Sequence, residues 1–199
     1  PDGGVARLRV WGRVAKDWSK VGPDERLDLL AMENGGRGII ANDEHYGSVE
    51  NLTAPGRGVN MGDGWETRRR REPGHDWAVL ELGAAGLIDE VIVDTAHFKG
   101  NYPDSASVEA AVMEDEGGGV SADVATRTSA DWRGVLPQTK LQPDHLHTFE
   151  RELRPDVAAT HVRLNIFPDG GVSRFRVFGT PTPDARRRAI LRQLNALDE

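Results

Sequence analysis

The 199-residue chain contains no cysteine. This absence excludes disulfide frameworks, thiolate nucleophiles, cysteine-based zinc sites and iron–sulfur clusters. No apolar run approaches the roughly 20 residues that are needed to span a bilayer. The first residues, PDGG, also lack the basic start and apolar stretch of a secretory signal. We therefore expect a soluble, cytoplasmic protein with no membrane partner.

The chain also lacks an excess of positive charge. The chain has 25 Lys+Arg against 32 Asp+Glu, a formal net charge of −7. Proteins that coat nucleic acid owe much of their affinity to phosphate neutralisation, so this balance predicts no nucleic-acid partner. A dense basic run, Arg68–Arg71, is typical of a solvated turn with one or two arginines directed inward. The hydrophobic content of 38% is ordinary for a globular chain and is enough to build a core.

A motif occurs twice in the chain. PDGGVARLRVWG at 1–12 and PDGGVSRFRVFG at 168–179 are identical at nine of twelve positions. Such self-similarity indicates a repeated module. We interpret the chain as the terminal strand of a truncated first repeat (1–12), a linker (13–34), one whole repeat (35–180) and a C-terminal helix (181–199). The strand Val5–Trp11 then needs a partner, because a lone strand edge invites association.

The rest of the chain shows short strand-like segments separated by Gly- and Pro-rich turns. Within the second motif, alternation predicts Val172, Arg174 and Arg176 on one side of a strand, with Phe175 and Val177 on the other. Segments of this kind without intervening amphipathic helices predict an all-β fold, a jelly-roll β-sandwich. The predicted strands are Gly38–Ala41, Trp77–Leu82, Glu90–Phe98, Ser107–Met113, His147–Leu153, Thr160–Phe167 and Val172–Phe178.

The last segment has a different pattern. Thr182-Pro183-Asp184 combines a capping hydroxyl, a proline at the first helical position and an early carboxylate, which is a helix start. An apolar stripe at helical spacing follows and indicates a packing surface. Its members are Ile190, Leu191, Leu194 and Leu197.

The side chains best suited to catalysis or ligand binding form two clusters. In Asn60–Arg68, Asp63 and Glu66 offer oxygens for acid–base or metal chemistry beside glycines that let a ligand approach the backbone. The alternative is a Gly-rich turn whose aspartate caps its own backbone. In Asp94–Asn101, strand alternation predicts a shared face that suits an anionic small molecule. That face would carry Thr95, His97, Lys99 and Asn101.

For this second cluster the alternative is a half-buried histidine beside a lysine that reaches solvent. His145 and His147 are spaced so that both rings lie on one strand face, but no third ligand is evident and we predict no metal site. The sequence requires no cofactor, and a divalent metal stays open.

Five stretches of the sequence together resemble the allantoicase family. They are NMGDGWET (Asn60–Thr67), the Arg68–Arg71 run, GHDW (Gly74–Trp77), VDTAHFKGN (Val93–Asn101) and THVRLNIFPDGG (Thr160–Gly171). The resemblance implies two tandem jelly-roll repeats of the galactose-binding-like type, and the repeated motif independently calls for a duplication. It also implies hydrolysis of allantoate to ureidoglycolate and urea, with allantoate as the small-molecule partner and a homo-oligomer as the expected assembly.

Roles for individual residues follow from that implied chemistry. Glu66 and His97 are the acid–base candidates, and Asp63 would orient one of them or a ureido group. Two cations, Arg68 and Lys99, would bind the carboxylate of the substrate. The two ureido arms would contact Asn60 and Asn101.

Two other classes of function stay open at this point. A galactose-binding-like sandwich can be a non-catalytic ligand-binding module, for which Trp65, Trp77 and Trp132 are available as platforms, although Trp77 is expected in the core. The terminal helix and the first strand would also suit a structural role in an assembly.

Overall fold

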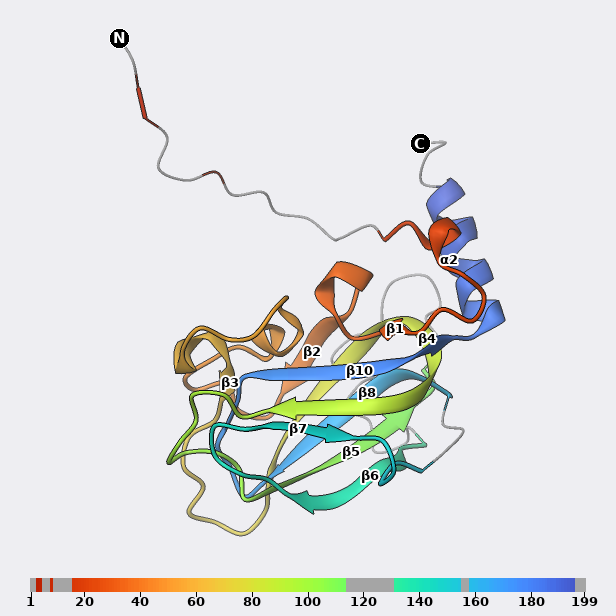
Figure 1. The fold of residues 1–199 in the computed structure, drawn as a ribbon. Coiled ribbons are helices and arrows are strands. Elements are labelled where there is room, and N and C mark those ends of the chain that lie inside the picture. The colour runs from red at the N-terminus through yellow and green to blue at the C-terminus, as the bar shows by residue number, and fades with distance from the viewer. Residues whose placement is uncertain (1–2, 5–7, 9–15, 114–130, 155–157, 196–199) are drawn as a thin grey trace.

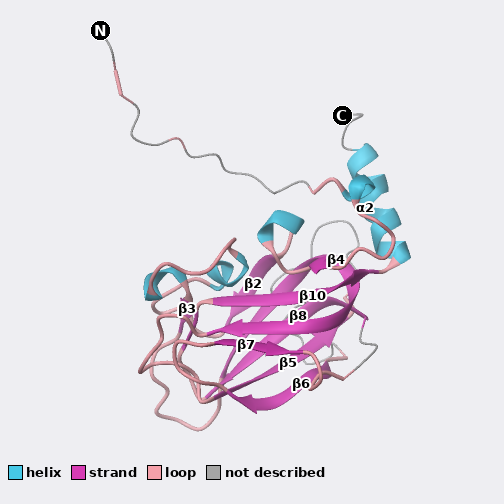
Figure 2. Cartoon of the chain, in the orientation of Figure 1, coloured by secondary structure: helices cyan, strands magenta, loops and turns pink. Residues whose placement is uncertain are grey.

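The computed structural model describes residues 3–4, 8, 16–113, 131–154 and 158–195. Apart from Leu8, the predicted strand Val5–Trp11 lies outside these residues, as does Leu197 of the predicted helical stripe. The described part is an antiparallel β-sandwich followed by one α-helix, which confirms the predicted all-β class (Figures 1 and 2). No helix in the described residues is long and apolar enough to cross a membrane.

In the described part of the chain, ten strands and a terminal helix alternate with short 3-10 turns. The strands are β1 (Leu27–Asp28), β2 (Arg37–Ala41), β3 (Trp65–Glu66), β4 (Asp76–Asp94), β5 (Ser105–Ala111), β6 (Arg133–Lys140), β7 (Leu146–Phe149), β8 (Ala158–Phe167), β9 (Gly171–Val172) and β10 (Arg174–Pro181). The helix is α2 (Pro183–Asn195). The 3-10 turns are η1 (Trp18–Lys20), η2 (Met32–Asn34), η3 (Val49–Thr53) and η4 (Met61–Asp63).

Strand β4 takes part in both layers of the sandwich. Its first half, Asp76–Glu81, pairs with β2 and β8, and β8 continues through β5 to β6. Its second half, Val91–Asp94, pairs with β7 on one side and β10 on the other. The strand therefore passes from one layer into the other along its own length (Figure 1).

The middle of β4 explains the crossing. The pairing with β8 breaks between Glu81 and Gly86, where the sequence reads Gly83-Ala84-Ala85-Gly86. A Cβ on Gly83 would lie 1.9 Å from the carbonyl oxygen of Asn34, and one on Gly86 would lie 2.5 Å from a methyl of Leu29. The small residues thus let the strand bend where other backbone lies close against it.

The core lies between the two layers. It is built by inward-facing residues of each strand, among them Leu80, Leu164 and Phe175, all fully buried. Leu29 and Leu30, which follow β1, are also fully buried there. Part of the expected linker 13–34 therefore packs with the sandwich, and β1 extends the β10 edge.

The structure corrects three details of the predicted strands. The segments predicted as Trp77–Leu82 and Glu90–Phe98 are one strand, and it ends at Asp94 rather than Phe98. A strand was missed at β6, where Pro137 and three hydrophilic neighbours hide the alternation. Val172 lies in the core with Phe175 and Val177, because Ser173 interrupts the strand between β9 and β10 and shifts the alternation.

Helix α2 begins as the sequence predicts. The Thr182 hydroxyl accepts a hydrogen bond from the Ala185 N–H at 3.3 Å, and Pro183 occupies the first helical position. The helix packs through Ala185, Ala189 and Ile190 against η1, so the stripe is correct at Ile190. Leu191, predicted in the same stripe, is instead 48% exposed.

Removing the helix cap gives a local test of this packing. We expect Thr182→Ala to lower the opening free energy of α2 by about 1 kcal/mol, because one N-terminal N–H loses its partner. Hydrogen exchange of the α2 amides measures this quantity. Thr182→Ser keeps the accepting hydroxyl and should leave exchange nearly unchanged; equal loss in both variants would contradict the capping role.

Candidate active site

Four loops meet at one end of the sandwich. They are residues 54–64, the turn 95–104 that follows β4, the segment 141–145 before β7, and residues 168–173. Backbone hydrogen bonds join them: the Ser173 N–H donates to the Asp94 carbonyl at 2.7 Å, and the Gly171 N–H donates to the Asn101 carbonyl at 2.8 Å. We call Asp63, His97 and Asn101 from these loops, together with Glu66 at the end of β3 and Arg174 at the start of β10, the loop-end site.

His97 has an unusual backbone conformation. Its φ is +72°, in the left-handed region that costs a non-glycine residue energy unless its surroundings impose it. The predicted strand face of Thr95, His97, Lys99 and Asn101 is therefore wrong, because β4 has already ended and the chain turns, with the Phe98 N–H donating to the Thr95 carbonyl. His97 nevertheless reaches the candidate site from this turn.

The 141–145 segment holds the turn in place. Asp144, itself left-handed with φ +49°, accepts the His97 N–H at 2.8 Å, and its own N–H donates to the Phe98 carbonyl. The hydrogen bond from His97 lowers the pKa of the Asp144 carboxyl. The Thr95 hydroxyl adds bonds to the backbone of Gln142 and His145. This reciprocal network orients His97.

The ring of His97 has one fixed tautomer when neutral. Nε2 lies 2.7 Å from the carbonyl oxygen of Gly58. Because a carbonyl oxygen only accepts, Nε2 carries the proton and the lone pair is on Nδ1. His97 can therefore take a proton at Nδ1 while its other nitrogen is held, as a general base requires.

The first cluster contributes two carboxylates with different partners. Glu66, at the end of β3, accepts a short hydrogen bond from the side-chain amide of Asn101. Asp63 faces the guanidinium of Arg174, at 2.9 Å between Oδ2 and Nη2, and also accepts the Val59 N–H. The Asn60–Arg68 and Asp94–Asn101 clusters thus lie at the same end of the sandwich, joined by the contact between Glu66 and Asn101.

The charge state of Asp63 follows from these contacts. Partial burial opposes ionisation, but the hydrogen bonds from Arg174 and Val59 outweigh it and hold the pKa of Asp63 below its usual value. Arg174 is 4% exposed, and its Nε has no hydrogen-bond partner among the described residues. Asp63 is accordingly an anion that faces a buried cation.

A pocket apart from the loop-end site is lined by the residues that follow Glu66 in the chain, Arg68–Glu72, together with Asn42, Asp43 and Asp76. Its volume is about 500 Å³ and it contains Arg68, whose Nε donates to Asp43 at 2.5 Å. Arg70 turns inward to the buried Asp76, whereas Arg69 and Arg71 are exposed, which matches the predicted solvated turn. The structure therefore pairs Arg68 with Asp43 and not with His97.

Two further predicted residues lie at the rim of the loop-end site. Lys99 is exposed, and its Nζ lies 3.9 Å from the Asp144 carboxylate. Asn60 is exposed and precedes η4 without a side-chain capping bond. Both are free to contact a ligand from solvent.

Several residues of this region were missed by the sequence analysis. Arg57 makes two hydrogen bonds to the buried Asp94, at 2.9 and 3.2 Å, and Asp144 and Arg174 hold His97 and Asp63. Arg174 carried a signal, because it lies in the repeated motif. Arg57 and Asp144 carried none, since loops that are distant in sequence bring them here.

Within the described residues, no three His, Asp or Glu side chains gather as ligands for a metal ion. One of the two histidines considered for this role is engaged otherwise: His147 Nε2 accepts the Gln142 N–H at 2.8 Å, so its Nδ1 carries the proton and donates to the Val93 carbonyl. The His147 ring is therefore a neutral structural group.

This arrangement predicts a pH dependence of stability. Burial lowers the pKa of His147 from its ordinary value of 6.5, so the unfolded chain binds this proton more readily than the folded one. The contribution of the neutral ring is present above pH 6.5 and is lost as pH falls below it. We expect the free energy of unfolding to fall more between pH 7.5 and about 5.5 in the wild type than in His147→Gln. Equal falls in denaturant titrations would contradict the assignment.

The family model described as the allantoicase repeat matches residues 27–182. The chain belongs to the allantoicase family. A probable allantoicase of Pseudomonas syringae pv. syringae is 56% identical over 179 residues, which cover 90% of this chain and 53% of that protein. The corresponding protein of Photobacterium profundum is 53% identical over the same shares.

Solved structures place the fold in the same family. The crystal structure of allantoicase from Saccharomyces cerevisiae superposes with a TM-score of 0.69 at 41% identity, covering 90% of this chain and 49% of that one. The chain thus spans about half the length of the allantoicases it matches. The C-terminal domain of a Bacteroides fragilis chitobiase, at 12% identity and a TM-score of 0.53, shares the fold alone.

Of the three tryptophans considered as ligand platforms, Trp132 is half-buried and lies against the guanidinium of Arg163. Trp65 is fully buried, and its indole N–H donates to the Asp43 carbonyl at 2.8 Å, so it is a core residue. Trp77, predicted in the core, is instead half-buried on the outer face of the sheet, because β4 begins at Asp76 and Ala78 takes the inward position.

Proposed function

We propose that the loop-end site takes part in the hydrolysis of allantoate to ureidoglycolate and urea. The observation that carries the proposal is the meeting of His97, held in one tautomer in a left-handed turn, with the ionised Asp63 and the Glu66–Asn101 pair. The kinship with allantoicases of Pseudomonas and yeast supports the same reaction.

The reaction needs few groups. The bond between the central carbon and one ureido nitrogen breaks, and a bond to a water oxygen forms. The departing urea nitrogen takes up one proton, and the water gives one up. Transfers of this kind are general acid–base catalysis by side chains within hydrogen-bond reach of the reacting atoms.

The residues divide into three roles. His97 Nδ1 takes the proton of the attacking water, and Glu66, as a carboxylic acid, gives its proton to the leaving ureido nitrogen and becomes a carboxylate. Asn101, which already donates to Glu66, orients that carboxyl and one ureido arm, while Asn60 contacts the other. Asp63 supplies a negative charge near His97, and this charge attracts the imidazolium when it forms.

The substrate carboxylate requires a cation. Lys99 lies at the rim of the site, and its Nζ contacts the described residues only through Asp144 at 3.9 Å, so this cation is available to a ligand. Arg68 is a weaker candidate here than the sequence suggested, because Asp43 already neutralises it. Arg57 belongs to the network around His97, because it pairs with Asp94 and is attracted by the charge of Asp144.

Urea release from allantoate by the purified chain tests the proposal, with allantoate binding measured by calorimetry in the same sample. We expect both, and sedimentation of that sample should show the homo-oligomer that the sequence analysis predicts. Binding without urea release would favour the non-catalytic module. Neither binding nor release by the folded chain would overturn the proposal.

A further inference from the structure

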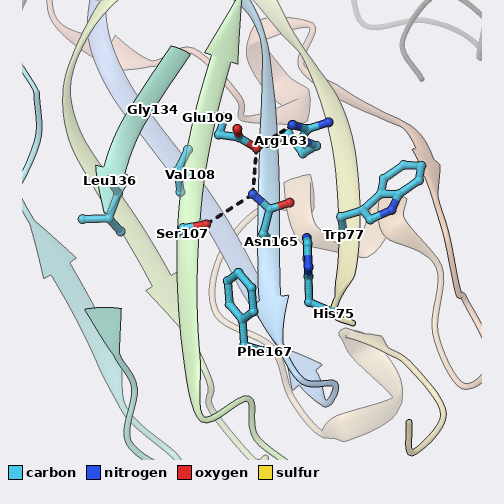
Figure 3. A pocket seen from close by; sticks show the side chains of 10 residues that line it. All are labelled: His75, Trp77, Ser107, Val108, Glu109, Gly134, Leu136, Arg163, Asn165 and Phe167. Carbon is cyan, nitrogen blue, oxygen red and sulfur yellow. Dashed lines mark hydrogen bonds and ion pairs between the residues drawn. The ribbon is translucent and has the colours of Figure 1, made fainter. Parts of the chain in front are cut away.

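A groove lies on the outer face of the sheet, apart from the loop-end site. Its volume is about 500 Å³, and none of its lining residues belongs to that site. It runs over β5 and β8, with β6 on one side and the start of β4 on the other (Figure 3). We call it the sheet groove; its lining includes His75, Trp77, Ser107, Glu109, Arg163, Asn165 and Phe167.

The floor of the sheet groove is polar. Ser107 and Asn165 are direct neighbours in the pairing of β5 with β8. The side-chain amide of Asn165, which is 5% exposed, donates to the Ser107 hydroxyl at 3.2 Å and to a Glu109 carboxylate oxygen at 2.9 Å. Because a carboxylate only accepts, the atom that faces Glu109 is the amide nitrogen.

This orientation leaves one acceptor and one donor side by side. Asn165 Oδ1 accepts no hydrogen bond from the described residues, and Figure 3 shows it directed away from Ser107, toward the side on which Trp77 and His75 stand. The Ser107 oxygen accepts from Asn165, so its own proton is available to donate. A donor beside an acceptor on the groove floor complements an amide edge that presents C=O and N–H together.

The charges of the sheet groove cancel. Arg163 donates to the same Glu109 oxygen through Nε at 2.8 Å and Nη2 at 2.7 Å, and among the described residues no other charged side chain except the titratable His75 lines the groove. An anion such as a carboxylate would meet Glu109 without a free countercharge. The groove therefore favours an uncharged ligand.

Flat rings form its walls. The rings of His75 and Phe167 are 4.6 Å apart at 33°, and Trp77 stands on the same side (Figure 3). At the far end, Trp132 lies 4.6 Å from the guanidinium of Arg163 and keeps it over the sheet. Aromatic surfaces beside a polar floor suit a thin ligand that packs its faces and hydrogen-bonds at its edge.

We propose that the sheet groove binds a small, uncharged, planar ligand with an amide or ureide edge. The Ser107 hydroxyl donates to its carbonyl oxygen, Asn165 Oδ1 accepts its N–H, and Trp77 packs against its face. This site is independent of the loop-end site and of the reaction proposed there.

Hydantoin, an uncharged cyclic ureide, is a suitable probe. In a ¹⁵N-labelled titration we expect saturable shifts of the Asn165 side-chain amide and the Trp77 indole N–H, with a Kd on the order of 1 mM, as suits so small a ligand. Ser107→Ala should raise Kd about five- to tenfold through the loss of one hydrogen bond. Trp77→Leu should raise it by at least about as much.

Matched controls separate binding from folding. Thr148→Val removes a hydroxyl from an exposed position of β7, and Tyr46→Leu removes an exposed ring; neither residue lines the sheet groove, so both variants should leave Kd unchanged. If Trp77→Leu does not fold, Ser107→Ala alone decides, since Asn165 keeps its bond to Glu109 in that variant. No saturable shifts, or equal Kd in Ser107→Ala, would overturn the proposal.

Two other occupants of this face would give different results. A hydroxylated ring such as methyl β-galactoside, titrated in parallel, should shift these signals less than hydantoin; preference for the sugar would refute an amide-selective site. A second copy of the chain would bury the face, so a dimer in sedimentation that Trp77→Leu dissociates would also refute the proposal.

Discussion

Replacing His97 with glutamine should lower the rate of urea release from allantoate by about two to four orders of magnitude, the usual contribution of a positioned general base. Glutamine still donates a hydrogen bond to the Gly58 carbonyl, so the turn should keep its shape. It has no basic nitrogen in place of Nδ1. Allantoate binding, measured by calorimetry, should therefore change much less than turnover.

His45→Gln is the matched control, because His45 is exposed on a neighbouring loop and makes its side-chain contact only with Tyr46 among the described residues. It should keep wild-type turnover. Full activity in His97→Gln would remove His97 from the mechanism. A loss of binding as large as the loss of turnover would make it a residue that holds the substrate instead.

Adding one methyl group at Gly171 should destabilise the protein by about 3 kcal/mol, the upper part of the range for overpacking a core. A Cβ at this position would lie 2.0 and 2.1 Å from two ring carbons of Phe98, which is fully buried. Phe98 follows His97 in the turn, so relief of the clash must move that turn. We expect Gly171→Ala to lose both stability, in denaturant titrations, and activity.

Gly100→Ala provides the comparison within the same turn. No atom lies within 4 Å of a Cβ built at Gly100. This variant should unfold at nearly the wild-type denaturant concentration and keep its activity. If both alanine variants behave alike, the contact between Gly171 and Phe98 does not position His97.

Much of this fold is predictable from the sequence because its signals are local. Turn residues mark the ends of most strands, and the threonine–proline pair marks the start of α2. The length of β4 is not local information. Its Gly-Ala-Ala-Gly centre looks like a turn, and only the close approach of Asn34 and Leu29 shows that it is a bend within one strand.

The candidate site shows the same limit. Asp63, Glu66 and His97 were identified from their residue types and local setting, and the structure brings their clusters together. The contacts that determine their chemistry are long-range: Arg174 is 111 residues from Asp63, and Asp144 is 47 from His97. The left-handed backbone of His97 has no signature in a sequence that reads as a continuing strand.

Because β4 belongs to both layers, the sandwich has no internal boundary along which one sheet can open from the other. Its central amides should exchange with solvent only through global unfolding, whereas the loops open on their own. The end of this strand at Asp94 carries the turn of His97. If the site closes around a ligand, the loops on the side opposite His97 therefore move, while His97 stays fixed at the end of β4.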